Sequence, residues 1–205
     1  MGYLDIYEAQ LEEYLLSLLS NRMFMTVVAV AGAVIILELL SYVFHALGMS
    51  AIAKHRGIRG RWMAWLPFVD VYMMGNICDR YLLEVKGKQT HKRKTLLGLY
   101  IALLVVTVIT SVVGAFLGVA ATLSLDESVL LVVALVALAF SAALLVLAVI
   151  LLVQQYIVYY HIYYSCHPDS AAVLTVLSVF FPVIIPFVVF ALRHKVNGMP
   201  PSKVV

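Results

Sequence analysis

Long apolar runs alternate with short polar breaks and predict most of the elements of this chain. The runs cover residues 24–47, 95–120, 129–153 and 171–192. Each exceeds about 18 residues, the length at which an apolar stretch can cross the roughly 30 Å hydrocarbon layer as a helix. We therefore expect an all-α fold, a polytopic helical membrane protein with about four transmembrane helices that form a single membrane domain over residues 1–205.

The third run does not stop at residue 153. Glutamines and tyrosines follow it, so we expect the helix to continue to about residue 165. Tyrosine rings are favoured at the depth of the lipid headgroups. The tyrosines from Tyr156 to Tyr164 therefore predict an aromatic collar where this helix leaves the hydrocarbon layer.

Two further segments are apolar without being good spans. Residues 3–20 place apolar side chains at spacings of three and four, which predicts an amphipathic helix. Residues 62–83 are mostly apolar, yet Pro67 and three charged residues interrupt them. Because such charges are costly at membrane depth, we expect an interfacial or re-entrant helix-turn-helix there. Its anchors would be the aromatic residues Trp62, Trp65, Tyr72 and Tyr81.

Composition supports the membrane class. Of the residues, 64% are hydrophobic and 12% are charged, and the mean hydropathy is +1.03, whereas a soluble domain carries about 25% charged residues. Ten of the fourteen lysines and arginines lie between Lys54 and Lys94. The positive-inside rule then predicts a cytoplasmic loop 48–94 and an N-terminus outside. We expect a multi-pass protein of a cytoplasmic-type membrane.

One detail conflicts with four spans. They would leave the basic segment Arg193–Lys195 outside, against the same rule. Pro182 and Pro186 lie within the last run. They are expected to kink that helix or to turn it back to the inner face.

The first span contains the best candidate for an intramembrane polar site. Glu38 lies near its middle, and Ser41 and His45 follow at three and seven residues, on the same helical face. An ionised carboxylate at this depth is costly unless it is paired or hydrated. The three residues are consistent with a cation or proton site. A carboxylate protonated by burial, or satisfied by a neighbouring hydroxyl, is the structural alternative.

Small residues on the second span predict close helix packing. Gly114 and Gly118 form a GxxxG pair, and Thr110 extends the row by one turn. We expect this face to pack against another helix of the same chain. A homodimer contact is the alternative.

The basic residues beside the spans predict contacts to anionic headgroups rather than to nucleic acid, because both clusters are juxtamembrane. They are Lys54, Arg56, Arg59, Arg61, Lys92, Arg93 and Lys94. Elsewhere, His161, Cys166, His167 and Asp169 are metal-ligating residue types without a metal-binding spacing. We expect neither a metal nor another cofactor. Without a recognisable catalytic motif, we do not expect an enzyme.

The segment from Trp62 to Asp79 has the pattern WxAWxPxxxxYxxGxIxD and precedes a basic linker. In this pattern the chain resembles an uncharacterised family of small multipass membrane proteins from Gram-positive bacteria. The resemblance implies a multipass architecture and a bacterial origin, and it implies no activity.

Two functions follow as expectations. The first is a non-catalytic scaffold or an accessory subunit of a membrane complex, with the lipid bilayer, a membrane protein or a second copy as partner. The alternative is a small transporter or channel whose polar site lies around Glu38 and His45.

Overall fold

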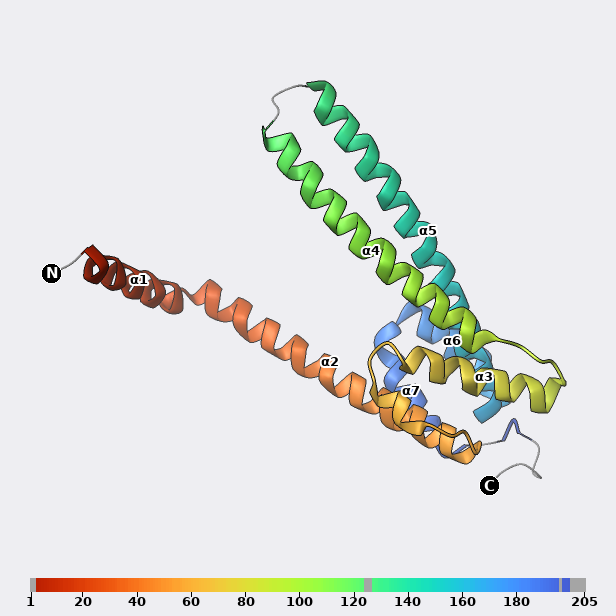
Figure 1. Cartoon of the computed structure of the whole chain (residues 1–205). Coiled ribbons are helices and arrows are strands. Elements are labelled where there is room, and N and C mark those ends of the chain that lie inside the picture. The colour runs from red at the N-terminus through yellow and green to blue at the C-terminus, as the bar shows by residue number, and fades with distance from the viewer. Residues whose placement is uncertain (1–2, 124–126, 196, 200–205) are drawn as a thin grey trace. The chain divides into compact units, whose positions relative to one another are not determined.

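The computed structural model describes residues 3–123, 127–195 and 197–199, and all regular secondary structure in them is helical. The chain divides into two compact units, residues 1–43 and 44–205. The elements are α1 (Tyr3–Ser20), α2 (Arg22–His55), the 3-10 helix η1 (Arg61–Trp65), α3 (Asp70–Lys86), α4 (Lys92–Leu123), α5 (Glu127–Cys166), η2 (Pro168–Ser170), α6 (Ala171–Phe180), η3 (Pro182–Ile184) and α7 (Ile185–Leu192). Figure 1 shows them in chain order.

The first unit contains α1 and the N-terminal part of α2. Helix α1 covers the same residues as the amphipathic helix that the spacing predicts. Asn21 separates the two helices, and its side-chain Oδ1 accepts a hydrogen bond from the Met23 amide at 3.0 Å, which caps the start of α2. Residues 22–31 and 33–40 of α2 are exposed, although most are apolar. This part of α2 therefore contributes no protein core.

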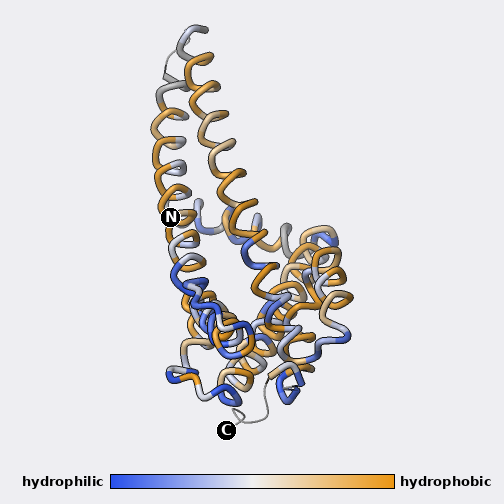
Figure 2. The backbone as a smooth tube through the Cα atoms, turned by 90° about the vertical axis from the view of Figure 1, so that its right-hand side faces the viewer, coloured by the Kyte–Doolittle hydropathy of each residue, from blue (hydrophilic) through white to orange (hydrophobic). Residues whose placement is uncertain are grey.

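Among the described residues, three helices are long and apolar enough to cross a membrane: Arg22–His55, Lys92–Val119 and Leu130–Cys166. The most apolar 18-residue windows of the three are 0%, 6% and 6% buried within the protein. Figure 2 shows that the α4–α5 pair is hydrophobic over most of its length. Hydrophilic residues gather at the lower end of the pair in this view, where it joins the other helices of the second unit.

Residues 171–192 do not form the one continuous helix expected as a fourth span, because they divide into two short helices. Helices α6 and α7 contain 10 and 8 residues, about 15 and 12 Å at 1.5 Å per residue, and too short to cross a bilayer. The helix ends before Pro182, which has no amide hydrogen and clashes with the preceding turn. The number of candidate spans is therefore three among the described residues.

Helices α4 and α5 lie side by side and antiparallel (Figures 1 and 2). On α4 the partly buried positions include Leu103, Val106, Thr110, Val113 and Leu117, at alternating spacings of three and four. This spacing is the seam of a coiled-coil-like pair. Most of the other apolar side chains in the stretches 104–119 of α4 and 130–150 of α5 are exposed.

The core of the second unit lies where the end of α2, the start of α4 and the end of α5 meet α3, α6 and α7. Its largest fully buried side chains are Tyr81, Tyr163, Met49, Met73, Ile77, Leu96, Ile162, Val158 and Val189. The segment expected to be interfacial or re-entrant contains η1, a turn and α3. Within it Tyr81 is 1% exposed, so the expectation that this ring anchors the segment at an interface is wrong.

Two glycines allow backbones to touch in this core. A Cβ added to Gly75 of α3 would lie 2.6 Å from the amide nitrogen of Arg93, in the first turn of α4. A Cβ added to Gly48 of α2 would lie 2.8 Å from backbone atoms of Val189 and Phe190 in α7. Any larger side chain would therefore separate α3 from α4, or α2 from α7.

Candidate functional site

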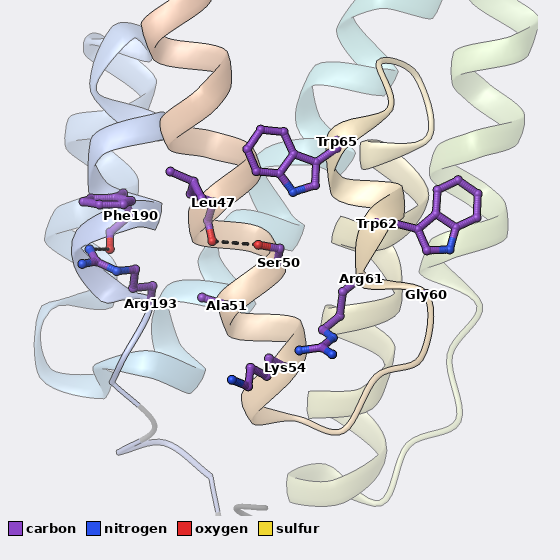
Figure 3. Close-up of a pocket in the computed structure, with 10 residues that line it drawn as sticks. All are labelled: Leu47, Ser50, Ala51, Lys54, Gly60, Arg61, Trp62, Trp65, Phe190 and Arg193. Atoms are coloured by element: carbon purple, nitrogen blue, oxygen red, sulfur yellow. Dashed lines mark hydrogen bonds between the residues drawn. The ribbon is translucent and has the colours of Figure 1, made fainter.

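A groove of about 680 Å³ runs beside the C-terminal part of α2. Figure 3 shows its lining, which comes from α2, from Gly60 and η1, and from α7 with the residue that follows it: Leu47, Ser50, Ala51, Lys54, Gly60, Arg61, Trp62, Trp65, Phe190 and Arg193. Leu47 and Trp65 lie at one end of the view, and Lys54 and Arg61 lie at the other. The groove therefore changes from apolar to basic along α2.

The basic end carries Lys54, Arg61 and Arg193, and the lining contains no acidic side chain. Within the described part of the chain, Lys54 and Arg61 are exposed and form no ion pair. Arg193 lies over the Phe190 ring at 3.6 Å from its centroid, and its Nη1 donates to the Phe190 carbonyl at 2.9 Å. These contacts hold the guanidinium at the groove, which is suited to an anionic group.

Both tryptophans of the chain line this groove. Trp62 is 62% exposed and Trp65 is 43% exposed. Gly60 precedes them with φ of 83°, a left-handed conformation that favours glycine. It reverses the chain between α2 and η1, so the indoles of η1 come to lie beside Lys54 and Leu47.

The structure separates the basic residues that the sequence groups as headgroup contacts. Lys54, Arg59, Arg61 and Lys94 are exposed. Arg56 is only 3% exposed, so a headgroup contact by this residue is wrong. Its position follows from helical spacing, because Ala46, Met49, Ala53 and Arg56 lie along the buried face at the end of α2.

Arg56 joins three elements. Its Nη1 donates to the Ile77 carbonyl of α3 at 3.3 Å, and its Nη2 donates to the Ser165 hydroxyl and contacts Cys166 Sγ at 3.6 Å, both at the end of α5. Burial lowers the pKa of Arg56 from its ordinary value. Arg56 is therefore a structural link between helices.

Lys92 and Arg93 are also engaged within the protein, where they lie partly buried. The Asp79 carboxylate of α3 accepts the backbone amides of Lys92 at 2.8 Å and Arg93 at 3.2 Å. It also accepts the Thr90 hydroxyl at 2.6 Å. Asp79 thus caps the N-terminus of α4 from a neighbouring helix. Lys92 Nζ donates to Gln154 of α5 at 2.9 Å.

The expected intramembrane site falls across both units. Glu38 is exposed and, with Ser41, belongs to the first unit, whereas His45 belongs to the second. His45 Nε2 lies 3.2 Å from the Tyr159 hydroxyl of α5. Asp70, at the start of α3, interacts with the His45 charge; burial raises the pKa of Asp70, and His45 opposes that shift. The sequence alone indicates neither of these partners.

The small-residue row on α4 divides between two faces. A Cβ added to Gly114 or to Gly118 would meet no other atom within 4 Å, so the expectation that these two glycines pack within the chain is wrong. Thr110 lies partly buried in the α4–α5 seam, and its hydroxyl donates to the Val106 carbonyl of its own helix at 2.8 Å. Below Thr110, the larger side chains Val113 and Leu117 occupy the seam in place of the glycines.

The tyrosines at the end of α5 fall into two groups. Tyr160 and Tyr164 are exposed, as expected for a collar. Tyr163 is fully buried, stacks on Tyr159 with centroids 5.9 Å apart, and shares a hydrogen bond with Ser178 Oγ at 3.1 Å. The collar is therefore also part of the core.

The four residues of metal-ligating type at the end of α5 do not form a cluster. His161 Nδ1 lies 2.6 Å from the Ile157 carbonyl, and His167 Nδ1 lies 2.9 Å from the Ser170 hydroxyl. Across the described ranges, no group of three or more histidine, cysteine, aspartate or glutamate side chains is arranged to hold a metal ion.

Comparisons with known proteins returned no match: no family model, no curated protein and no solved structure is similar to this chain.

Proposed function

We propose that this chain is an integral membrane protein that crosses the bilayer three times and acts as a non-catalytic scaffold or accessory subunit. The observation that carries the membrane assignment is the exposure of the three apolar helices, whose most apolar windows are 0% to 6% buried. Surfaces of this kind are unfavourable in water at about 25 cal/mol per Å² of apolar area. A lipid environment removes that cost.

Three spans improve the agreement with the positive-inside rule. With the N-terminus outside, the loop 48–94 and everything after α5 are cytoplasmic. Thirteen of the fourteen lysines and arginines then lie inside, and Arg22 alone lies outside. The conflict over the basic segment Arg193–Lys195 disappears, because the broken run 171–192 returns the chain to the inner side. The location remains the bacterial cytoplasmic membrane, as the family resemblance implies.

The scaffold assignment is supported by how the buried polar residues are used. Arg56 and Asp79 join helix ends to one another through hydrogen bonds, so these two buried charged residues serve the packing of the helices. Gly114 and Gly118 leave open space beside α4 and offer a small-residue surface to a partner helix or to a second copy. Lipid headgroups are the other proposed partner, and no nucleic acid is involved.

Two experiments test this proposal. Membranes containing the chain are washed with alkaline carbonate, and the protein is expected to stay in the pellet; release into the supernatant contradicts membrane integration. The chain is then purified in a mild detergent. Recovery of a stoichiometric protein partner or a homo-oligomer supports the scaffold role, and recovery of a lone monomer contradicts it.

A second candidate is a small transporter or channel, and the meeting of His45 with Tyr159 and Asp70 favours it. A permeation path needs polar groups from several helices at one depth, and these three come from α2, α5 and α3. In proteoliposomes, Glu38→Gln and His45→Ala are each expected to abolish proton or cation flux if this function is correct. Flux that is absent from the unmodified protein, or unchanged in both variants, eliminates it.

A further inference from the structure

The groove beside α2 is the strongest unassigned feature of the molecule. We propose that it binds the headgroup of one anionic phospholipid, with the phosphate between Lys54, Arg61 and Arg193 and an acyl chain toward Leu47 and Trp65. This inference rests on the proposed membrane function and names one of its partners.

The charge of the groove lining is the first observation that supports an anionic ligand. The three cations come from α2, η1 and the residue after α7, and no acidic side chain lines the groove. In the described structure, Lys54 and Arg61 have no carboxylate partner. Arginine presents a planar set of donors that matches a phosphate. A negatively charged group of phosphate size therefore completes the basic end of the groove.

The positions of the lining residues along α2 are the second observation, and they support a lipid. Leu47, Ala51 and Lys54 lie on one face of the helix at spacings of four and three. The rise from Leu47 to Lys54 is about 10 Å. Since α2 leaves the hydrocarbon layer toward its C-terminus in the proposed topology, the basic end of the groove lies at the headgroups and the apolar end lies at the acyl chains.

The aromatic residues of the lining are the third observation, and they also support a lipid. Phe190 and Trp65 line the groove together with Leu47, and Trp62 lines it beside Arg61. Indole rings are favoured at the membrane interface, where one side is apolar and the other is polar. A soluble phosphate would use the cations but would not cover the exposed surfaces of the two indoles. A phospholipid uses both parts, which is why we assign the anion to a lipid.

Both tryptophans of the chain lie at the groove, so all of its tryptophan fluorescence reports on that site. The full chain in a mild detergent is titrated with phosphatidylglycerol brominated in its acyl chains. Bromine quenches an indole only at close approach. We expect quenching to saturate with phosphatidylglycerol at a much lower mole fraction than with brominated phosphatidylcholine. Equal quenching by both lipids, or no quenching by either, overturns the proposal.

The variant Lys54→Gln with Arg61→Gln removes two exposed cations from the groove. It is expected to raise the half-saturating fraction of phosphatidylglycerol about 30-fold, the effect of losing two cations near an anionic headgroup. The matched control, Lys86→Gln with Lys88→Gln, removes two exposed cations that do not line the groove and is expected to change this fraction less than about twofold. Equal effects in the two double variants overturn the proposal. Circular dichroism melting of both variants verifies that they fold.

Competition with soluble anions distinguishes a lipid headgroup from a free phosphate as the ligand of the groove. Inorganic phosphate and glycerol phosphate at millimolar concentration are expected to leave the lipid quenching unchanged. If either reverses it, the groove takes a soluble phosphate and the lipid assignment fails. Carbonate extraction of the membranes from which the chain is purified distinguishes failure of the lipid site from failure of the membrane function. A chain that resists extraction but shows no preference for phosphatidylglycerol refutes only this inference, whereas an extracted chain refutes the membrane function as well.

Discussion

Two regions of the second unit are built in opposite ways. The arm, residues 104–119 of α4 and 130–150 of α5, exposes apolar side chains, and Val108 and Leu138 are 60% and 66% exposed. The base contains η1, α3, α6, α7 and the adjoining ends of α2, α4 and α5. It buries charged groups, and Arg56 and Asp79 are 3% and 9% exposed. This contrast supports the proposal that lipid surrounds the arm, whereas in the base hydrogen bonds compensate for buried charge.

The largest expected effect concerns a thiol of the base. Burial, followed by the Asp79 charge, raises the pKa of Cys78 from 9.0 to about 12. The thiolate is the reactive form, so at neutral pH its population falls about 1000-fold, one factor of ten per pKa unit. Native Cys78 is therefore expected to resist iodoacetamide, and mass spectrometry of its peptide measures the rate. A Lys88→Cys variant supplies an exposed reference thiol, and equal rates for the two thiols would contradict a buried base.

The raised pKa of Cys78 also makes the stability of the folded state depend on pH. The folded state holds the proton on Cys78 more tightly than the unfolded state does. This contribution to stability is fully present below about pH 9 and is lost as the pH rises through about 12. Alkylation during a pH titration is therefore expected to remain slow until the alkaline end of that window.

The second prediction inserts one charge into each region. Val108→Lys places an ammonium on the arm, where a lysine at the centre of a spanning helix costs about 2.5–3.5 kcal/mol. Val85→Lys makes the same change on an exposed position of α3, where surface substitutions stay within about 0.5 kcal/mol. We expect Val108→Lys to reduce strongly the carbonate-resistant amount of the full chain, and Val85→Lys to leave it unchanged. Similar amounts for both variants would show that the arm does not lie in lipid.

The arm and the base also differ in how far the sequence predicts them. Apolar run length predicts the helices of the arm, because a long run has one stable state in lipid. The expected continuous helix over residues 171–192 fails because run length ignores the break at Pro182. Among the described residues, hydropathy alone therefore overestimates the number of helices that are long enough to span.

The arrangement of the base cannot be predicted from local sequence patterns alone. Lys54 and Arg56 lie two residues apart in one basic cluster, yet one lines the groove and the other is buried. The spacing of Ala46, Met49, Ala53 and Arg56 is a signal that could have placed Arg56 inside. Arg193 joins the groove from a distant part of the chain, and only the tertiary structure reveals it.

The third prediction removes the cap that joins α3 to α4. Asp79→Ala leaves two backbone amides and the Thr90 hydroxyl without their acceptor. Hydrogen bonds to a charged group contribute about 1.5–3 kcal/mol each, so we expect the free energy of unfolding in detergent to fall by about 3 kcal/mol. Asp79→Asn retains an acceptor and is expected to lose less. Asp169→Ala removes an exposed acid and serves as the control, with a loss below about 1 kcal/mol.

The smallest expected effects come from adding one methyl group to each region. Gly75→Ala in the base would push a Cβ against the first turn of α4, 2.6 Å from the Arg93 amide nitrogen, and overpacking of this kind costs about 1–3 kcal/mol. Gly114→Ala in the arm meets no atom within 4 Å and improves the helix propensity by about 1 kcal/mol. Thermal unfolding in detergent is therefore expected to shift in opposite directions for the two variants. Destabilisation by Gly114→Ala would show instead that this face is covered by another helix, as in a dimer, and that the arm is not surrounded by lipid alone.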